Sequence, residues 1–202
     1  MNKRIRGVVL LILGGSLVLG AAALAFMQKQ RDRLAGETAT ALVSVMKSGR
    51  CTVQSEPPQP PAEEPEASVP AEPIALTPDG YEMLGILRIE ALSIELPVLA
   101  QWSDALLDIA PCRYSGTVAG GNLVILGHSY SSHFRSLWKA EVGMSVEMTD
   151  AAGFVHRYRV AALETVAGTD GDALPSQYPL TIFTCTADSK HRILVRCDAV
   201  GQ

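Results

Sequence analysis

Cysteine and aromatic residues are scarce in this sequence, and basic residues are outnumbered by acidic ones in its C-terminal part. Four Cys in 202 residues are too few for a disulfide-rich scaffold. The Cys and His residues lack the clustered spacing of a structural zinc site, and no glycine-rich phosphate-binding motif occurs, so no metal or other cofactor is expected. Residues 76–202 carry nine basic and fourteen acidic side chains, which argues against a nucleic-acid-binding domain.

The clearest long feature is an uncharged run of 21 residues from Gly7 to Met27. As a helix it measures roughly 30 Å, about the thickness of a bilayer's hydrocarbon core. Basic residues flank it, and the short basic N-terminus favours a cytoplasmic position. The alternative is a cleaved signal peptide, because Ala23-Leu24-Ala25 has the small-x-small form of a cleavage site. The run is longer than a usual signal core, so an uncleaved transmembrane anchor is the preferred prediction, with the following residues outside the cytoplasm.

Two segments without a hydrophobic core follow this run. Residues 28–55 have helix-forming composition, with Leu34, Leu42, Val45 and Met46 as a loose apolar stripe. They either extend the membrane helix or form a juxtamembrane stalk, and the stalk is the preferred prediction. Residues 56–78 contain eight of the twelve prolines and five Glu, and they are predicted to form an extended linker. Such a linker reaches at most some 70 Å, so it can hold a domain away from a membrane.

Residues 79–202 show the pattern of an all-β domain. Short apolar runs alternate with Gly-, Pro-, Asp- and Ser-rich turns, which is typical of a closed barrel or a sandwich. One short helix is predicted at residues 103–111, with Ser103 or Asp104 as N-cap, and a second helical turn at residues 132–140. The predicted strands cover residues 83–92, 93–100, 121–128, 144–150, 154–166, 179–185 and 191–200.

Residue alternation assigns side chains to faces. Leu180 and Ile182 share one face of their strand, whereas Phe183 and Cys185 share the other. The run of residues 122–126 is almost continuously apolar, which indicates a strand buried on both sides. That strand ends at Gly127-His128.

One Cys, one His and one Arg form the candidate site. A nearby imidazole can generate or stabilise the thiolate that acts as nucleophile, and a guanidinium can stabilise the oxyanion of the attacked carbonyl. Cys185 lies at a strand end in a polar stretch, His128 follows a buried strand, and Arg192 begins the next strand. His191 is the alternative to His128, and Arg196 is the alternative to Arg192.

The remaining Cys and His residues receive other assignments. Cys197 alternates with core residues and is assigned to the core. Cys112 is either a small packing residue or a disulfide partner of Cys197, and Cys51 lies in the stalk. His133 and His156 lie in polar surroundings and are predicted to be on the surface.

Four stretches together resemble the sortase family, in the right order and over about residues 81–200. PLTIFTCTADSKHRILV is similar to the sortase stretch that holds the catalytic Cys and, after a short loop, the Arg. NLVILGHSY is similar to the strand that ends in the catalytic Gly-His. LGILRIEALSIELPV and HFRSLWKAEVGMSVEM resemble the opening strands and the segment after the His.

The resemblance implies an eight-stranded sortase β-barrel with one or two short helices, forming a catalytic domain over residues 79–202. Cys185 would be the nucleophile, His128 the general acid and base, Arg192 the oxyanion-stabilising or substrate-positioning group, and Thr184 a substrate-binding residue. The implied reaction cleaves a C-terminal, LPxTG-like sorting signal through a thioacyl enzyme. The implied acceptor is an amine of a peptidoglycan precursor or of a pilin, outside a membrane that holds the single-pass anchor. The segment of residues 164–179 lacks a long helical insertion, which weakens an assignment to class B.

Two other readings remain. Another cell-wall cysteine peptidase or transpeptidase is one, although the L,D-transpeptidases usually carry Ser-x-Gly-Cys-x-Arg and papain-type enzymes place Cys before His. A membrane-tethered, non-catalytic binding domain of sortase shape is the other. The presence of all three side chains argues against it.

Overall fold

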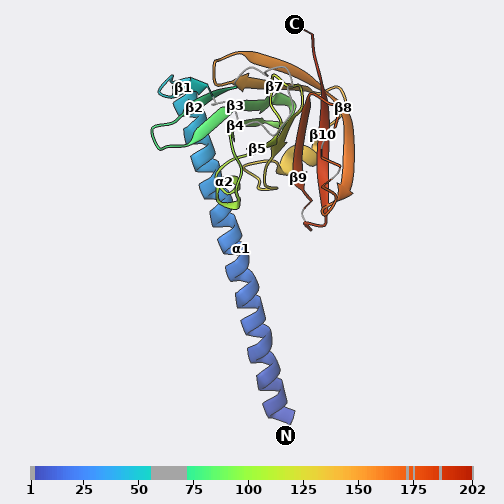
Figure 1. Cartoon of the computed structure of the whole chain (residues 1–202). Helices are drawn as coiled ribbons and strands as arrows, with labels where there is room; N and C mark the ends of the chain where they lie inside the picture. Colours follow the sequence, from blue (N-terminus) through green and yellow to red (C-terminus); the bar gives the residue numbers. More distant parts are fainter. Residues whose placement is uncertain (1–2, 56–71, 172, 175, 187, 202) are drawn as a thin grey trace, which may run out of the picture.

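In the part of the chain that the structure describes, ten strands hydrogen-bond into one sheet, and part of that sheet closes on itself (Figure 1). The computed structural model describes residues 3–55, 72–171, 173–174, 176–186 and 188–201, without the side chains of residues 3–12 and of Ser55. In chain order the elements are α1 (Lys3–Lys47), β1 (Thr52–Ser55), β2 (Pro73–Leu76), β3 (Glu82–Ile89), η1 (Glu90–Leu92), β4 (Ile94–Leu99), α2 (Asp104–Leu107), β5 (Cys112–Ser115), β6 (Leu123–Leu126), η2 (Arg135–Lys139), β7 (Ser145–Asp150), β8 (Val155–Ala167), β9 (Leu180–Cys185) and β10 (His191–Ala199).

The barrel closes at β3, which pairs antiparallel with β4 along one edge and with β7 along the other. The ring runs β3-β4-β5-β6-β9-β10-β8-β7, so the eight-stranded barrel predicted from the sequence is confirmed. Two neighbouring pairs, β4–β5 and β6–β9, are parallel. Because parallel strands end at the same side of a sheet, the last residues of β6 and β9 meet at one rim of the barrel.

Both predicted helical segments are present. Ser103 is the N-cap of α2, and its hydroxyl accepts the N–H of Leu106 at 3.2 Å. The second segment, residues 132–140, holds the 3₁₀ helix η2. Helix and strand periodicity therefore describe most of this domain correctly.

The interior and exterior faces of the barrel follow the predicted alternation. Leu180 and Ile182 of β9 and Val195 and Cys197 of β10 are buried in the main core inside the barrel. On the outer face, Phe183 packs in a second cluster with Val124, Leu194 and Leu174. The strand β9 is therefore buried on both sides until Cys185, which is half-buried.

A two-stranded addition extends the barrel beyond the predicted domain start at residue 79. The strands β1 and β2 pair antiparallel, and Ala75 and Leu76 of β2 pair with the start of β3. Both strands lie in segments that were expected to be stalk and linker. They were not predicted from the sequence, because a strand of four residues is too short to show a clear alternation of apolar and polar side chains. Pro73 is the first residue of β2, where a missing N–H is tolerated. Residues 56–71 of the expected linker lie outside the described residues.

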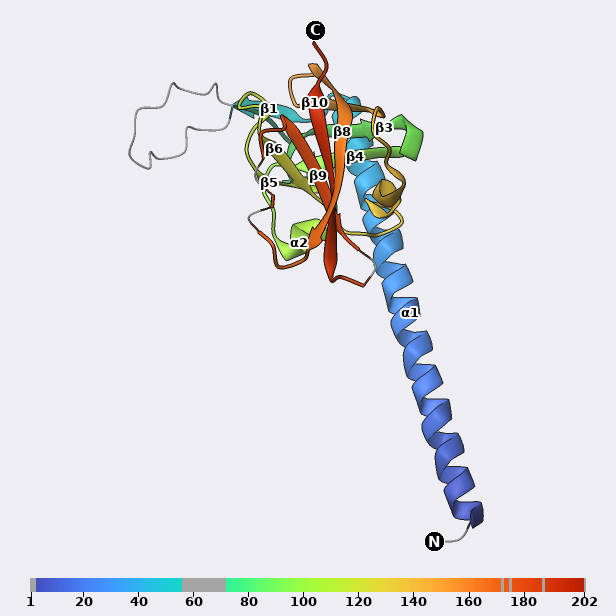
Figure 2. The same cartoon turned by 90° about the vertical axis from the view of Figure 1, so that its right-hand side faces the viewer.

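The helix α1 runs unbroken from Lys3 to Lys47, through the expected boundary between anchor and stalk. Its C-terminal third packs on the barrel through Ala35, Ala39, Leu42 and Val43, whose spacing follows one helical face. Leu34 of the expected stripe is instead 59% exposed, because the packed face is turned from it by one residue. The other end projects away from the barrel in both ribbon views (Figures 1 and 2).

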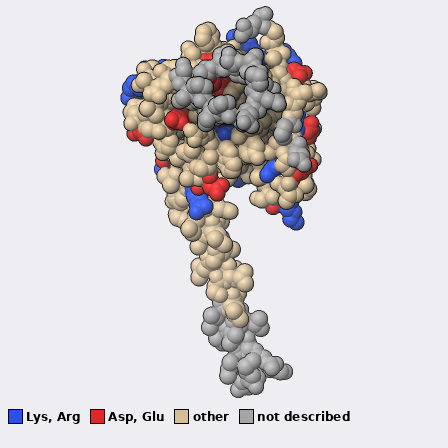
Figure 3. All heavy atoms as spheres, in the orientation of Figure 1, with Lys and Arg blue, Asp and Glu red and all other residues tan. Residues whose placement is uncertain are grey.

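Charged side chains of both signs are distributed over the barrel surface and the adjoining part of α1, whereas the described part of the helix that projects furthest from the barrel shows none in the view of Figure 3. Within the described residues, no helix combines the length and the hydropathy needed to cross a membrane. The expected span of residues 7–27 includes residues 7–12, whose side chains lie outside that description.

Candidate active site

Cys185 ends β9 and lies directly opposite Arg192 near the start of β10. Residues that oppose each other in an antiparallel pair share a face, with Cβ atoms about 4.5–5.5 Å apart. A turn joins the two strands, closed by the Thr186 N–H, which donates to the carbonyl of His191 at 2.9 Å. The hairpin therefore places a thiol and a guanidinium side by side at the half-buried end of the strand.

His128 reaches the same rim from the other side of β9. The parallel β6–β9 register pairs Leu126 with Phe183, and the Gly127 N–H donates to the Phe183 carbonyl at 3.2 Å. Continuing that register by two residues brings His128 level with Cys185. The three predicted side chains thus come from the ends of three neighbouring strands, with β9 in the middle (Figure 2).

Gly127 is required by the packing beneath His128. A Cβ at this position would lie 2.5 Å from the ring of Phe134, which is fully buried. The N–H of Phe134 also donates to the carbonyl of His128 at 3.1 Å. Absence of a side chain at residue 127 therefore lets Phe134 close under the backbone that carries the imidazole.

Two residues that the sequence reasoning missed contact His128. The carboxylate Oδ1 of Asp108 lies 3.6 Å from the imidazole Nε2, and it accepts the hydroxyl of Tyr130 at 2.6 Å. The ring of Tyr130 lies 4.7 Å from that of His128. Burial and the hydrogen bond to Asp108 raise the pKa of Tyr130 to about 12. No local pattern marks Asp108, because it meets His128 only through the fold.

Arg192 is held over the outer face of β9. Its guanidinium carbon lies 5.7 Å from the centre of the Phe183 ring, and its Nη1 donates to the Asp170 carbonyl at 3.3 Å. The first contact is a cation–π interaction. Both contacts keep the charge on the face that also carries Cys185. In this position the guanidinium is available to a carbonyl attacked by the thiol.

Comparisons with known proteins identify the family to which this fold belongs. The family model described as the Sortase domain matches residues 87–200, which include all three side chains. The chain belongs to the sortase family. A search of curated proteins gives no match. Family membership supports a sortase-type cysteine transpeptidase, so the resemblance seen in the sequence is confirmed.

Solved sortases share the fold. Sortase A from Corynebacterium diphtheriae is 27% identical with a TM-score of 0.54, and the match covers 60% of this chain and 62% of that chain, less than two thirds of its length. Sortase C-1 from Streptococcus pneumoniae is 25% identical with a TM-score of 0.52, covering 58% and 67%. A sortase D5 transpeptidase from Clostridium perfringens is 19% identical with a TM-score of 0.54, covering 59% and 79%, and supports the fold alone.

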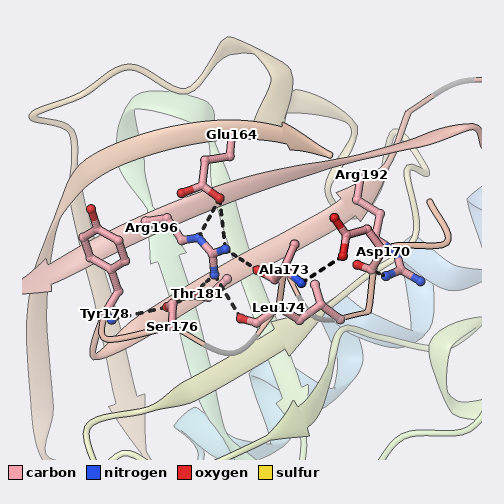
Figure 4. Close-up of polar contacts among 9 residues, drawn as sticks. All are labelled: Glu164, Asp170, Ala173, Leu174, Ser176, Tyr178, Thr181, Arg192 and Arg196. Carbon is pink, nitrogen blue, oxygen red and sulfur yellow. Dashed lines mark hydrogen bonds and ion pairs between the residues drawn. The ribbon is translucent and has the colours of Figure 1, made fainter. Parts of the chain in front are cut away.

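Arg196, the alternative to Arg192, is buried, and its guanidinium is bound by other residues of the sortase domain (Figure 4). Its guanidinium forms an ion pair with Glu164 at 3.0 Å and donates to the Leu174 carbonyl at 3.0 Å and the Thr181 hydroxyl at 3.1 Å. It also contacts the carbonyl of Ala173. Four positions along β10 separate it from Arg192, about 13 Å in a strand. Arg196 therefore fixes the β8–β9 loop and lies away from the thiol.

His191, the alternative to His128, lies on the wrong face. It is exposed and directly precedes Arg192, so strand alternation turns its side chain away from the face of Cys185. The surface prediction for His133 is wrong, because its side chain is 2% exposed and its ring lies 5.4 Å from that of Tyr130. His156 is half-buried and bonds to Asp150 at 2.9 Å.

Thr184, the predicted substrate-binding residue, directly precedes Cys185 on β9, so its side chain points to the opposite face of the strand. It is 1% exposed, and its hydroxyl has no hydrogen-bond partner among the described residues. The side chain belongs to the face of Leu180 and Ile182, toward the barrel interior. A buried hydroxyl in this position makes no contact with the outer face.

The other three Cys are free, as is Cys185. Cys112 packs in a cluster with Leu42, Met83 and Leu99, whereas Cys197 lies in the main core, so the alternative of a Cys112–Cys197 disulfide is not realised. Burial raises the pKa of Cys112 and of Cys197 to about 12. These two thiols remain protonated at neutral pH. Among the described residues, no cluster of His, Cys, Asp and Glu could hold a metal ion.

Proposed function

We propose that this protein is a membrane-anchored sortase that cleaves an LPxTG-like C-terminal sorting signal and transfers the cleaved protein to an amine. The observation that carries the proposal is the convergence of His128, Cys185 and Arg192 at the ends of three adjacent strands. A half-buried thiol between an imidazole and a guanidinium is suited to acyl transfer.

In the first half of the proposed reaction, one proton passes from Cys185 through His128 to the leaving amine. The sulfur of Cys185 bonds to the carbonyl carbon of the scissile peptide, between Thr and Gly of the signal, after its proton has passed to His128. Arg192 donates to the oxyanion of the tetrahedral intermediate. His128 then returns the proton to the departing amine, the C–N bond breaks, and a thioester remains on Cys185.

The second half reverses these roles. An acceptor amine attacks the thioester and loses a proton to His128, the C–S bond breaks, and the thiol is restored. We propose that the acceptor is an amine of a peptidoglycan precursor or of a pilin. One similar structure, of sortase C from Streptococcus pneumoniae, is described in terms of pilin substrate specificity.

Thr184 enters this proposal through its backbone. Its side chain is buried on the interior face, so we propose that it supports substrate binding by fixing the path of β9 immediately before the nucleophile. The signal itself would lie on the outer face. There the Phe183 ring, the Arg192 guanidinium and the β8–β9 loop meet beside Cys185.

The location is also part of the proposal. The uncharged run of residues 7–27, flanked by basic residues, supports a single-pass anchor with a cytoplasmic N-terminus and an extracellular catalytic domain. Secreted proteins with sorting signals and cell-wall acceptors meet at that outer surface. The proposed domains are the anchor at 1–27, the stalk at 28–55, the linker at 56–78 and the catalytic domain at 79–202.

The test uses the full chain in detergent, because α1 and the β1–β2 hairpin contact the barrel. A labelled LPxTG-like peptide is incubated with hydroxylamine, which traps the acyl group as a hydroxamate. We expect product from the wild type and from Cys51→Ala, and none from Cys185→Ala. Product that persists without Cys185 contradicts the proposal. Peptide binding without product supports a non-catalytic domain, and cleavage by water alone supports a peptidase.

A further inference from the structure

The loop that follows His128 is held from outside the barrel by the N-terminal helix. Asp32 of α1 accepts hydrogen bonds from two consecutive residues of that loop, Ser131 and Ser132. The N–H groups of Ser131 and Ser132 donate to its carboxylate at 3.2 Å and 3.0 Å, and the Ser132 hydroxyl donates at 2.7 Å. The Ser131 hydroxyl donates as well. We call Asp32, Ser131 and Ser132 the Asp32 clamp.

The carboxylate of the clamp is charged at neutral pH. Burial alone would raise the pKa of Asp32, but the hydrogen bonds from Ser131 and Ser132 outweigh it and lower the pKa to about 2. Hydrogen bonds to an ionised acceptor are stronger than those between neutral groups. The Ser132 hydroxyl also lies 2.8 Å from the main-chain oxygen of Asp32, so the clamp engages helix backbone too.

Small residues bring α1 close enough for these contacts. A Cβ at Gly36 would lie 2.9 Å from the Cβ of Ser132, which is closer than carbon atoms normally pack. Ala35 and Ala39 on the same helix are buried against the barrel. Glycine is unfavourable inside a helix, so its presence one turn after Asp32 is explained by this approach.

The clamp directly adjoins Tyr130, the residue whose side chain packs against the imidazole of His128. Ser131 directly follows Tyr130, whose ring lies 4.7 Å from that of His128. The Tyr130 hydroxyl donates to Asp108 at 2.6 Å, and Asp108 lies 3.6 Å from the imidazole Nε2. A displacement of Ser131 therefore displaces Tyr130 and changes the surroundings of His128.

We propose that Asp32 is a positioning residue of the active site, which fixes His128 through Ser131, Ser132 and Tyr130 and so makes the N-terminal helix part of the catalytic structure. This inference rests on the proposed role of His128 in acyl transfer. It implies that release of α1 from the barrel slows the chemical step without weakening the binding of the signal peptide, which would contact the opposite side of Cys185, near Arg192.

The experiment compares variants of the full chain in detergent. In Asp32→Ala we expect kcat for the labelled peptide to fall about tenfold, with KM within about twofold, because a misplaced acid–base group affects the reacting geometry and not the binding. Asp32→Asn keeps one acceptor oxygen, and we expect it to recover part of the loss. The matched control is Glu37→Gln, one turn further on, where Glu37 pairs with the exposed Arg33 at 2.8 Å. Its kcat should equal that of the wild type.

A second readout needs no sorting peptide. Alkylation of Cys185 by iodoacetamide, followed by mass spectrometry, reports how His128 activates the thiol, with His128→Ala as reference. We expect Asp32→Ala to shift the alkylation rate toward that of His128→Ala. If the wild type does not cleave the peptide, the proposed function fails. The alkylation rate of Cys185 in Asp32→Ala still tests whether Asp32 positions His128. Wild-type kcat and alkylation in Asp32→Ala, even with a lower melting temperature, would overturn the proposal, as would a rise in KM alone.

Discussion

Arg196 of β10 donates a hydrogen bond of 3.0 Å to the main-chain carbonyl of Leu174, which ties the β8–β9 loop to the outer face of the barrel (Figure 4). The Leu174 side chain is buried against Phe183, two residues before Cys185 on the same strand. Since Arg192 also binds this loop, at the Asp170 carbonyl, the loop forms a fixed wall beside the thiol. Two arginines on one face of β10 thus have different roles, and substitutions can separate them.

The first prediction is that Arg196→Met lowers the free energy of unfolding. Methionine keeps most of the volume, but it leaves the buried carbonyl of Leu174 and the Thr181 hydroxyl without this donor. Unsatisfied buried acceptors and the lost pair with Glu164 should together cost about 2–4 kcal/mol. Urea unfolding measures the change. A loss under about 0.5 kcal/mol would show that the network is dispensable.

The second prediction concerns Arg192→Lys, which keeps the charge and removes the planar fork of donors. We expect kcat to fall about a hundredfold, because a lysine ammonium cannot reproduce the geometry of the guanidinium toward an oxyanion. The free energy of unfolding should change by less than about 1 kcal/mol, since exposed contacts contribute little.

The control for this substitution is Arg157→Lys, at a side chain that is 65% exposed and pairs with Glu147 at 3.5 Å. Steady-state hydroxamate formation, with urea unfolding of the same samples, measures both quantities. Wild-type kcat in Arg192→Lys would remove the oxyanion role from this residue.

Much of the barrel can be predicted from the sequence because it depends on local patterns. Alternation in β9 correctly separates Leu180 from Phe183, and the strand–turn–strand pattern places Arg192 opposite Cys185. His128 is different, because it reaches the same rim only through the parallel pairing of β6 with β9, which no local pattern predicts. The choice of these three side chains therefore depends on the family resemblance, and their catalytic roles stay a prediction.

The supporting contacts could not be predicted, because they join distant segments. Asp32 and Ser132 are 100 positions apart, and nothing near either residue indicates that they meet. His133 lies among polar neighbours that suggest a surface position, yet its side chain is buried. Arg192 and Arg196 share a strand face, and only the path of the β8–β9 loop decides which one is buried.

A third prediction follows from the buried hydroxyl of Thr184, which has no hydrogen-bond partner among the described residues. In Thr184→Val, a methyl group replaces this hydroxyl, and we expect the free energy of unfolding to stay constant or rise by up to about 1 kcal/mol, since an unpaired buried polar group is removed. Because the side chain points away from the outer face, KM for the peptide should not change. An increase of KM by more than about threefold would indicate a direct contact with substrate.

The last prediction concerns stability at low pH. Burial lowers the pKa of His133 from its usual 6.5 to about 4. As the pH drops, the unfolded chain takes up this proton before the folded chain does. The contribution of neutral His133 to the free energy of unfolding is therefore fully present above the unfolded pKa, and it is lost as the pH falls from about 6.5 toward 4. Between pH 7 and pH 5 the loss from this residue is about 2 kcal/mol. Urea unfolding of His133→Phe, whose ring can keep the contact with Tyr130, should show a decrease smaller by that amount, whereas the exposed control His191→Gln should behave as the wild type. An identical pH dependence in His133→Phe and the wild type would mean that His133 becomes protonated without unfolding, through solvent access that this side chain, 2% exposed, does not have in this structure.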